Sequence, residues 1–250
     1  MQAEIQTRRK KLPKKLPKIE DENKKERNKL LAESLMKIIQ SSPKYKYDCA
    51  NTPQILYFEN SLYFRGKVIN CAISFGTALN HCYVWCVYNK CKTIYFFINS
   101  SGGDKKVKDT CVKKIERLKK IWIKSDIKIE CIVLQFCCSA AVELALECDT
   151  IKIYKNGQMG IHYPSNIKYV LNEDGTAAKS INSENPILEE DKIKIENYYE
   201  SKLHLDKETV CQLLAESKLL NTDEILKYNL ASEVIDTLPP QFKELRKLIK

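Results

Sequence analysis

Two apolar runs of strand length flank one amphipathic helix pattern in the middle of this 250-residue chain. Ile94–Ile98 and Ile127–Leu134 are nearly continuous in apolar residues, as in strands that are covered on both faces. Between them, Lys105–Ile123 places apolar residues on one helical face and lysines on the other. A strand, a helix and a second strand in this order form a right-handed crossover between parallel strands. The central stretch therefore predicts an α/β fold.

The alternation of strand and helix patterns continues on both sides of this stretch. We expect short strands at Ile55–Phe58, Leu62–Phe64 and Ile151–Tyr154, and a polar loop at Asn166–Asn185. The expected helices are Lys29–Gln40, Val68–Tyr88, Ser139–Leu146, Pro186–Leu203, Asp206–Ser217 and Thr222–Tyr228, the last with Thr222 as its N-cap.

The folded domain is expected over residues 54–237, between two basic segments. Residues 8–29 hold eleven Lys and Arg against four Asp and Glu, which accounts for most of the net charge of +10. A charge excess confined to one segment is typical of a solvated or targeting-derived tail, so we expect no nucleic-acid binding. We expect residues 1–45 to be largely disordered around their short helix, and residues 238–250 to form a basic tail.

The chain has no apolar run long enough to span a bilayer, for which about 18 residues are needed. We therefore expect no membrane partner. The first residues are basic but lack the apolar segment of an intact signal peptide.

The eleven cysteines are expected to be reduced, because their number is odd and no two are spaced as C-x-x-C. Cys82, Cys86 and Cys91 alternate with Tyr, Val and Trp at helical spacing, which favours small apolar core residues over zinc ligands. His81 and Cys82 find no second pair at ligand spacing. We expect a reducing compartment, and neither a metal nor a cofactor.

Three features of the central stretch point to hydrolytic chemistry. The first strand ends in Gly102–Gly103, where backbone N–H groups can turn toward a developing negative charge. Ser139 follows the second strand and enters a helix, so the N–H of Ala140 could join an oxyanion hole. His162 follows a glycine-bearing turn and could act as a general base. Nucleophile, base and oxyanion donors thus occur in the order of a hydrolase site.

Four segments carry a resemblance to a known family. In order they are INSSGG (98–103), CCSAA (137–141), IHYP (161–164) and LLNTDEILKYNLASEVID (219–236). This series resembles the proteolytic subunit of the ATP-dependent Clp protease, ClpP, over residues 55–237. The resemblance implies a crotonase-like fold of repeated ββα units with a protruding handle helix at Pro186–Leu203. It also implies heptameric rings that stack through the handles and receive substrate from a hexameric AAA+ Clp unfoldase.

The resemblance further implies a Ser-His-Asp triad, with the glycine pair as oxyanion hole. His162 matches the family histidine. Ser139 matches the nucleophile, although an ungapped alignment places Cys137 there instead. The position of the aspartate holds Ser217, and a hydroxyl cannot replace a carboxylate in stabilising a charged histidine. Glu216 and Asp149 are the other acids we considered, the first on the wrong side of its helix and the second more distant.

Three further departures accompany this change: Ala141 replaces a glycine, Ser101 a proline, and Glu143 stands where the family has an apolar residue. Such erosion resembles the plastid ClpR-type subunits, which keep the fold and lack a full triad. We therefore expect a non-catalytic, ring-forming pseudoenzyme in a plastid, working with an active paralogue. One alternative is an active serine endopeptidase that uses Ser139 and His162. The other is a crotonase-like acyl-CoA enzyme.

Overall fold

A computed structural model describes residues 53–122, 125–164, 168–171, 177–180 and 188–238, which all belong to the compact unit Tyr47–Lys250. The N-terminal extension with its expected helix at Lys29–Gln40, and residues 239–250 of the basic tail, lie outside the described residues. No helix among the described residues is long and apolar enough to cross a membrane.

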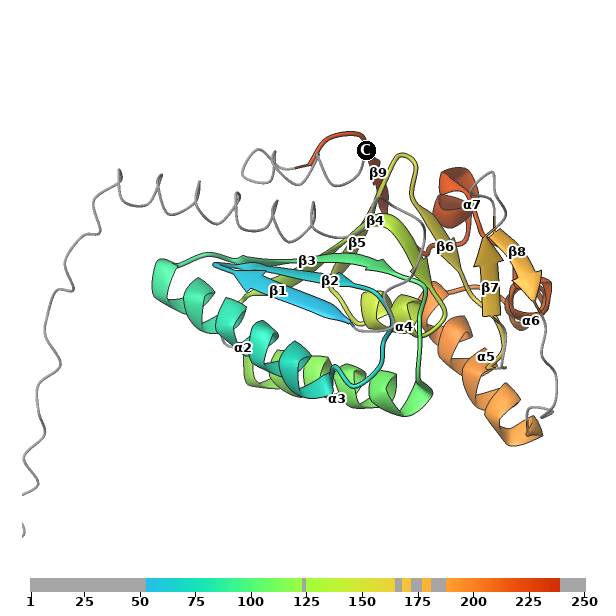
Figure 1. Ribbon diagram of the computed structural model, residues 1–250, viewed down its shortest axis with the longest axis horizontal. Coiled ribbons are helices and arrows are strands. Elements are labelled where there is room, and N and C mark those ends of the chain that lie inside the picture. Colours follow the sequence, from blue (N-terminus) through green and yellow to red (C-terminus); the bar gives the residue numbers. More distant parts are fainter. Residues whose placement is uncertain (1–52, 123–124, 165–167, 172–176, 181–187, 239–250) are drawn as a thin grey trace, which may run out of the picture. The chain divides into compact units, whose positions relative to one another are not determined.

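A seven-stranded sheet forms the centre of the described part, and all its neighbouring strands are parallel except the first two (Figure 1). In spatial order its strands are β1 (Gln54–Phe58), β2 (Ser61–Arg65), β3 (Thr93–Ser100), β4 (Lys128–Cys138), β5 (Thr150–Tyr154) and β9 (Glu233–Ile235). The short strand β6 (Gln158–Gly160) pairs with the last three residues of β4. The predicted α/β class with parallel strands is confirmed.

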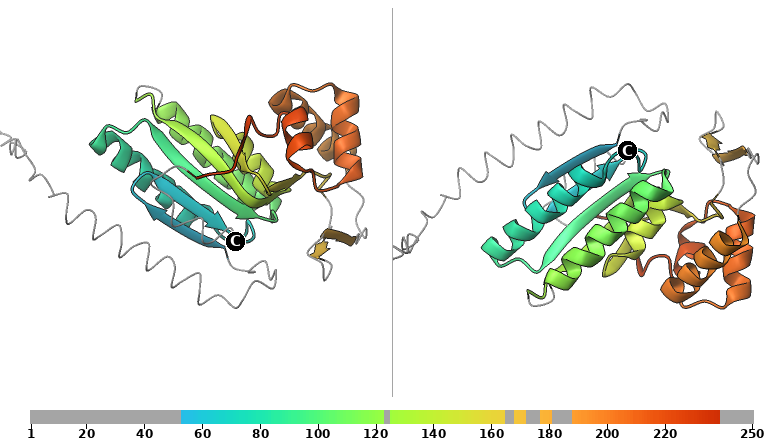
Figure 2. Two further views of the ribbon diagram at one scale, coloured as in Figure 1. Left: turned by 90° about the horizontal axis from the view of Figure 1, so that it is seen from above. Right: turned by 90° about the horizontal axis from the view of Figure 1, so that it is seen from below.

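Two groups of helices accompany the sheet. Helices α2 (Ala72–Asn89), α3 (Lys105–Trp122) and α4 (Ala140–Leu146) lie side by side on one of its faces (Figure 2). Helices α5 (Glu189–Leu203), α6 (Lys207–Glu216) and α7 (Thr222–Lys227) gather beyond the end of β4 (Figure 1). The first group covers the core, and the second group packs against the end of the sheet where the candidate site lies.

Strand β3 shows why both faces of the sheet are apolar. Ile94, Phe96 and Ile98 point into the main core beneath the helices, whereas Phe97 belongs to a second buried cluster on the opposite face. Alternate residues of a strand point to opposite faces, so a continuous apolar run is what a sheet buried on both sides requires. The run at Ile94–Ile98 is thus apolar because both faces of its strand are buried, as the sequence predicted.

Helix α2 begins at Ala72, four residues later than the expected Val68. The backbone of Val68 is already engaged with the glycine pair, since its N–H donates to the Gly102 carbonyl (2.8 Å) and its carbonyl accepts from the Asp104 N–H (2.8 Å). A residue bonded in this way cannot also start a helix. The apolar pattern of the sequence fits a helix that begins at Val68 as well as one that begins at Ala72, so the pattern alone did not locate the start of α2.

Two other expectations were wrong in detail. Helix α7 is capped by Asn221 and not by Thr222, in a capping box in which Asn221 and Glu224 bond to each other's backbone N–H groups. The expected loop at Asn166–Asn185 contains a two-stranded antiparallel sheet of β7 (Lys168–Leu171) and β8 (Ala177–Ser180) within its described residues.

A candidate active site at the end of strand β4

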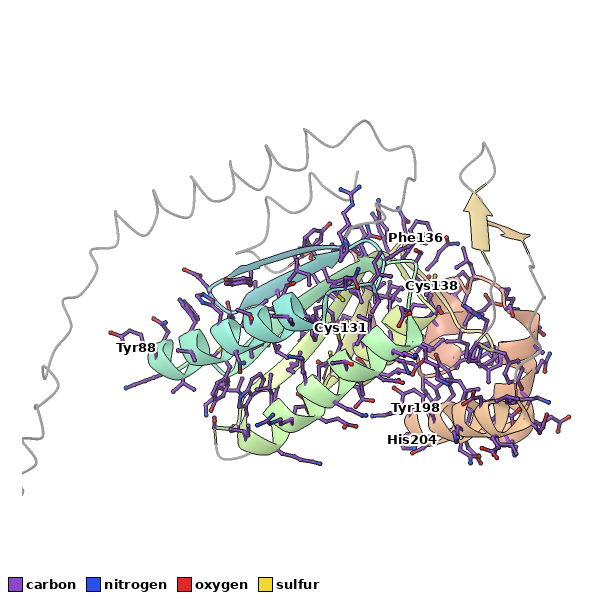
Figure 3. The ribbon with its side chains drawn as sticks, turned by 60° about the horizontal axis from the view of Figure 1, so that its bottom comes forward. Tyr88, Cys131, Phe136, Cys138, Tyr198 and His204 are labelled. Carbon is purple, nitrogen blue, oxygen red and sulfur yellow. The ribbon has the colours of Figure 1, made fainter. Side chains whose placement is uncertain are left out.

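Ser139 occupies a sharp turn between a strand and a helix. Strand β4 ends at Cys138, helix α4 begins at Ala140, and Ser139 between them has φ 54° and ψ −128°. Figure 3 labels Cys138 at this end of β4. A non-glycine residue in this sparsely populated region costs ~1–3 kcal/mol and persists only where its surroundings enforce it. A strained strand-to-helix turn is also how many hydrolases expose a nucleophilic serine.

Backbone hydrogen bonds hold the Ser139 turn from both sides. Its N–H donates to the Gly160 carbonyl of β6 (2.7 Å), and its carbonyl accepts from the N–H of Val142 in α4 (2.9 Å). The pairing of β4 with β6 continues this contact, since Cys138 lies opposite Gly160. The turn is therefore part of the sheet and not a separate loop.

The glycine pair at the end of β3 packs directly against this turn. Gly102 has φ +95°, and a Cβ atom on it would lie 2.6 Å from both the Cys138 carbonyl oxygen and the Ser139 Cβ, and 3.2 Å from the Ala140 nitrogen. A Cβ atom on Gly103 would lie 2.5 Å from the Val68 carbonyl oxygen. Both positions therefore exclude any side chain. The structure thus packs Gly102 against the Ser139 turn and the Ala140 nitrogen, and packs the adjacent Gly103 against the backbone of Val68.

His162 follows β6 by two residues, so it lies just beyond the strand that pairs with the end of β4. Its ring is buried, with 9% of its surface exposed. The Nδ1 atom lies 2.6 Å from the carbonyl oxygen of Tyr163. A carbonyl can only accept, so Nδ1 carries the proton in this contact, and in a neutral ring Nε2 is then the unprotonated nitrogen. This is the tautomer that a general base needs.

Ser217 lies near the backbone that follows His162. Met159 of β6 forms an isolated antiparallel bridge with Leu220, so the segment between α6 and α7 runs beside β6. The Tyr163 N–H reaches the Leu214 carbonyl (3.4 Å), which also accepts from the Ser217 hydroxyl (2.9 Å). The position that the resemblance gives to the acid is therefore next to the histidine, and its side chain is an alcohol turned toward the end of α6.

The two other acids considered from the sequence point elsewhere. Glu216 accepts hydrogen bonds from Gln212 (2.7 Å) and pairs with Lys218 (3.2 Å). Asp149 pairs with Lys119 (2.8 Å) and accepts from the N–H of Ile129, near the first residue of β4. Strand β4 is 11 residues long, and at about 3.3 Å per residue this puts Asp149 roughly 30 Å from the Ser139 end. Both carboxylates are thus engaged by other partners.

Cys137, the alternative nucleophile position, lies within β4 between Ser100 of β3 and Met159 of β6. Its side chain is fully buried. Burial, followed by repulsion from nearby cysteines, raises the pKa of its thiol well above the usual value. A thiol that is neither exposed nor ionised is a poor nucleophile.

Glu143 has a specific partner that the sequence did not reveal. Its carboxylate forms an ion pair with the ammonium of Lys108 on α3, and both side chains are nearly buried. Burial is the largest single influence and lowers the pKa of Lys108, but the attraction and hydrogen bonds of Glu143 and Asp109 together outweigh it, so the net pKa is raised. We expected the lysines of α3 on its solvent face, and for Lys108 this was wrong. The signal was present, because Lys108 falls three residues before Cys111 and seven before Ile115, on the apolar face.

The comparisons with known proteins agree with this architecture. The sequence model of the Clp protease family matches residues 83–238, more than half of the chain. The chain therefore belongs to the Clp protease family. No curated protein matches it individually.

Two solved structures are similar in fold. ClpP1 from Listeria monocytogenes is 16% identical, with a TM-score of 0.54 over 72% of this chain and 92% of that one. A point mutant of ClpP1 from Listeria monocytogenes is also 16% identical, with a TM-score of 0.53 over 76% of this chain and 95% of that one. The predicted resemblance to the ClpP family is confirmed. The ClpR subtype, the heptamer and the plastid remain predictions.

Proposed function

We propose that this chain is a ring-forming subunit of an ATP-dependent Clp protease complex and is itself a weak or inactive peptidase, of the ClpR type. One observation carries the proposal: Ser217, and not a carboxylate, occupies the acid position of the resemblance, and its hydroxyl shares the Leu214 carbonyl with the Tyr163 N–H next to His162. Its hydroxyl donates to the carbonyl of Leu214, so it faces the end of α6 as a donor. In this role the protein completes a heptameric ring, an active paralogue cuts the substrate, and an AAA+ Clp unfoldase delivers it.

The chemical cost of losing the acid follows from what the acid does. When Ser139 attacks a peptide carbonyl, His162 must take its proton and become positively charged. A buried carboxylate beside the ring stabilises this charge, and a serine hydroxyl contributes only a dipole. In a related triad even the change from carboxylate to amide costs about 10⁴ in rate. The rest of the site can still be assembled while turnover is very slow.

The alternative of an active endopeptidase rests on a separate observation, the strained turn at Ser139 with the Gly102 backbone against it. In that mechanism the Ser139 hydroxyl attacks, Nε2 of His162 accepts its proton, and the N–H groups of Gly103 and Ala140 receive the oxyanion. The match to the Clp protease family argues against the acyl-CoA alternative, because it covers residues 83–238, from within α2 to the end of the described chain.

Two measurements on the purified full chain test the proposal. Native mass spectrometry should give a heptamer, alone or with an active ClpP-type subunit, and a trimer would contradict it. A serine-reactive fluorophosphonate should label Ser139 only slowly, with Ser139→Ala as the control for specific labelling. Rapid labelling together with cleavage of a fluorogenic peptide would establish the active alternative.

The proposed compartment is an organelle with reducing conditions, the plastid in particular. The odd number of cysteines and the lack of any C-x-x-C pair favour a reducing environment. The basic segment at residues 8–29 is consistent with a targeting-derived extension. Imaging of the full chain with a C-terminal fluorescent tag tests this proposal.

A further inference from the structure

The region around His162 contains a hydrogen-bonded series that the proposed function does not use. The Nδ1 atom of His162 donates to the Tyr163 carbonyl (2.6 Å), and the Tyr163 hydroxyl donates to Oε1 of Glu196 on α5 (2.7 Å). His162 and Glu196 are both buried, with 9% and 4% of their surfaces exposed. A backbone acceptor next to the ring is thus connected through one side chain to a buried carboxylate.

We propose that the Tyr163 carbonyl, fixed by the Tyr163–Glu196 hydrogen bond, replaces the missing acid in holding His162 in its Nδ1–H tautomer. Tyr163 and Glu196 are therefore positioning residues for His162. This inference rests on the proposed function in one respect: it assumes that position 217 is where an active relative has its triad acid.

Three constraints restrict the direction of this carbonyl. Pro164 follows Tyr163, and a residue before proline is confined to extended backbone conformations. The Tyr163 N–H bonds to the Leu214 carbonyl of α6 (3.4 Å). The phenol ring is held at its far end by Glu196. With the backbone bonded on one side and the side chain on the other, the carbonyl cannot rotate away from the histidine.

Glu196 is a suitable anchor because it remains ionised. The hydrogen bond from Tyr163 lowers the pKa of its carboxyl below the usual value, and Lys207 lies 3.5 Å from its other oxygen. Burial, followed by the hydrogen bond to Glu196, raises the pKa of the Tyr163 hydroxyl, so this group stays protonated and remains the donor. A hydrogen bond to a charged acceptor is stronger than one between neutral groups.

The arrangement performs one of the two tasks of a triad acid. A carbonyl accepts the Nδ1 proton and so fixes tautomer and ring orientation, but it carries no charge to offset an imidazolium. His162 is therefore held as an oriented base. This explains how the histidine side of the site can stay ordered although Ser217 has replaced the carboxylate.

The tautomer of His162 can be measured without any assay of activity. The chain has only three histidines, His81, His162 and His204. In full-length protein labelled with [¹⁵N]histidine, solid-state NMR at neutral pH separates protonated from unprotonated ring nitrogens, and His162→Gln identifies the signal. We expect His162 as the Nδ1–H form. A predominant Nε2–H form would overturn the proposal, whatever the ring size or peptidase activity.

Two variants test the contribution of Glu196. Tyr163→Phe removes only the hydroxyl and should lower the ratio of Nδ1–H to Nε2–H by about threefold to tenfold, the effect of one hydrogen bond. Glu196→Gln keeps an acceptor without the charge and should cause a smaller decrease in the same ratio, so it serves if the first variant does not fold. An unchanged ratio in a folded variant of either kind would remove Glu196 from the mechanism.

Tyr198→Phe is the matched control. The Tyr198 hydroxyl of α5 likewise donates to a buried glutamate, Glu147 (3.0 Å), which caps the end of α4 opposite to Ser139. Its loss should leave the His162 ratio unchanged. A comparable change in this control would show that loosening α5 anywhere alters the histidine, which would also overturn the specific role of Tyr163.

Discussion

The two halves of the candidate site depend on different kinds of interaction. The nucleophile half consists of the glycine pair of β3 and the Ser139 turn, and it is built from backbone: positive φ angles and close backbone approach. The base half consists of His162 and the end of α6, and its chemistry depends on a side chain at position 217. The first half has the backbone geometry that the proposed site needs, and the second has a hydroxyl where the proposed site would need a carboxylate.

The difference shows which of the two halves can indicate whether the protein cuts peptides. A side chain on Gly102 would collide with the strand end that supports α4, so the nucleophile half is also required for folding. Ser217, by contrast, bonds to the last carbonyls of α6 and leaves the backbone arrangement in place. A folded protein of this kind must keep its Ser139 turn whether or not it cuts peptides. The acid is needed only for catalysis, so its loss is the more informative observation.

A carboxylate at position 217 has the largest expected effect on peptidase activity, because it would give the base half the acid that a complete triad needs. Ser217 has φ 50° and ψ 37°, a left-handed conformation that aspartate tolerates well. We expect Ser217→Asp to raise fluorophosphonate labelling of Ser139 and peptide cleavage by about 10²-fold or more, since a triad carboxylate is worth about 10⁴. Ser217→Asn, which has the same shape without the charge, should give little or no gain. No gain in a folded Ser217→Asp protein would mean that the base half lacks more than its acid.

Removing the glycine conformation tests the claim that the nucleophile half is structural. Gly102→Ala adds a Cβ atom 2.6 Å from two atoms of the Ser139 turn at φ +95°, so we expect a loss of about 3 kcal/mol in the free energy of unfolding. The control is Gly76→Ala within α2, where the added atom meets only the flexible end of Lys114 and alanine favours the helix. This variant should be neutral or slightly stabilised in urea unfolding. Equal stability of the two variants would contradict the distinction between the halves.

The sequence was most informative where one pattern has one physical cause. The apolar run Ile94–Ile98 and the helices Lys105–Ile123 and Asp206–Ser217 were all found close to their predicted positions. The ordered motifs around Ser139 and His162 identified the family. These features depend on local propensity and on periodic burial, and both can be recognised from residues that are neighbours in the sequence.

The sequence was least informative where a residue depends on a distant partner. The backbone pairing of Val68 with Gly103 delayed the start of α2, and the three-residue strand β6 has no pattern of its own. The Tyr163–Glu196 bond joins residues 33 positions apart, and nothing in the charged surface pattern of α5 distinguishes Glu196 from its exposed neighbours. Such contacts are consequences of the fold, so only the assembled structure reveals them.

Of the variants considered, those of the Lys108–Glu143 ion pair have the smallest expected effect. They test whether side chains also stabilise the nucleophile half. Lys108 lies on α3 after the glycine pair, and Glu143 lies one turn into α4 after Ser139, so the pair connects the two helices that leave the site. Removing one member of a buried pair leaves an uncompensated charge. Lys108→Met should therefore cost about 2 kcal/mol in urea unfolding, less than a fully isolated charge because Lys105 lies near Glu143.

The double variant Lys108→Met with Glu143→Leu is the decisive comparison. Well-packed apolar residues often replace a buried ion pair at no cost, so the double variant should recover most of the stability lost in the single one. If so, the pair specifies how α3 meets α4 without stabilising the fold, and the nucleophile half rests on its backbone geometry. If the double variant stays as unstable as Lys108→Met, the ion pair itself holds the two helices together, and the half depends on side chains after all.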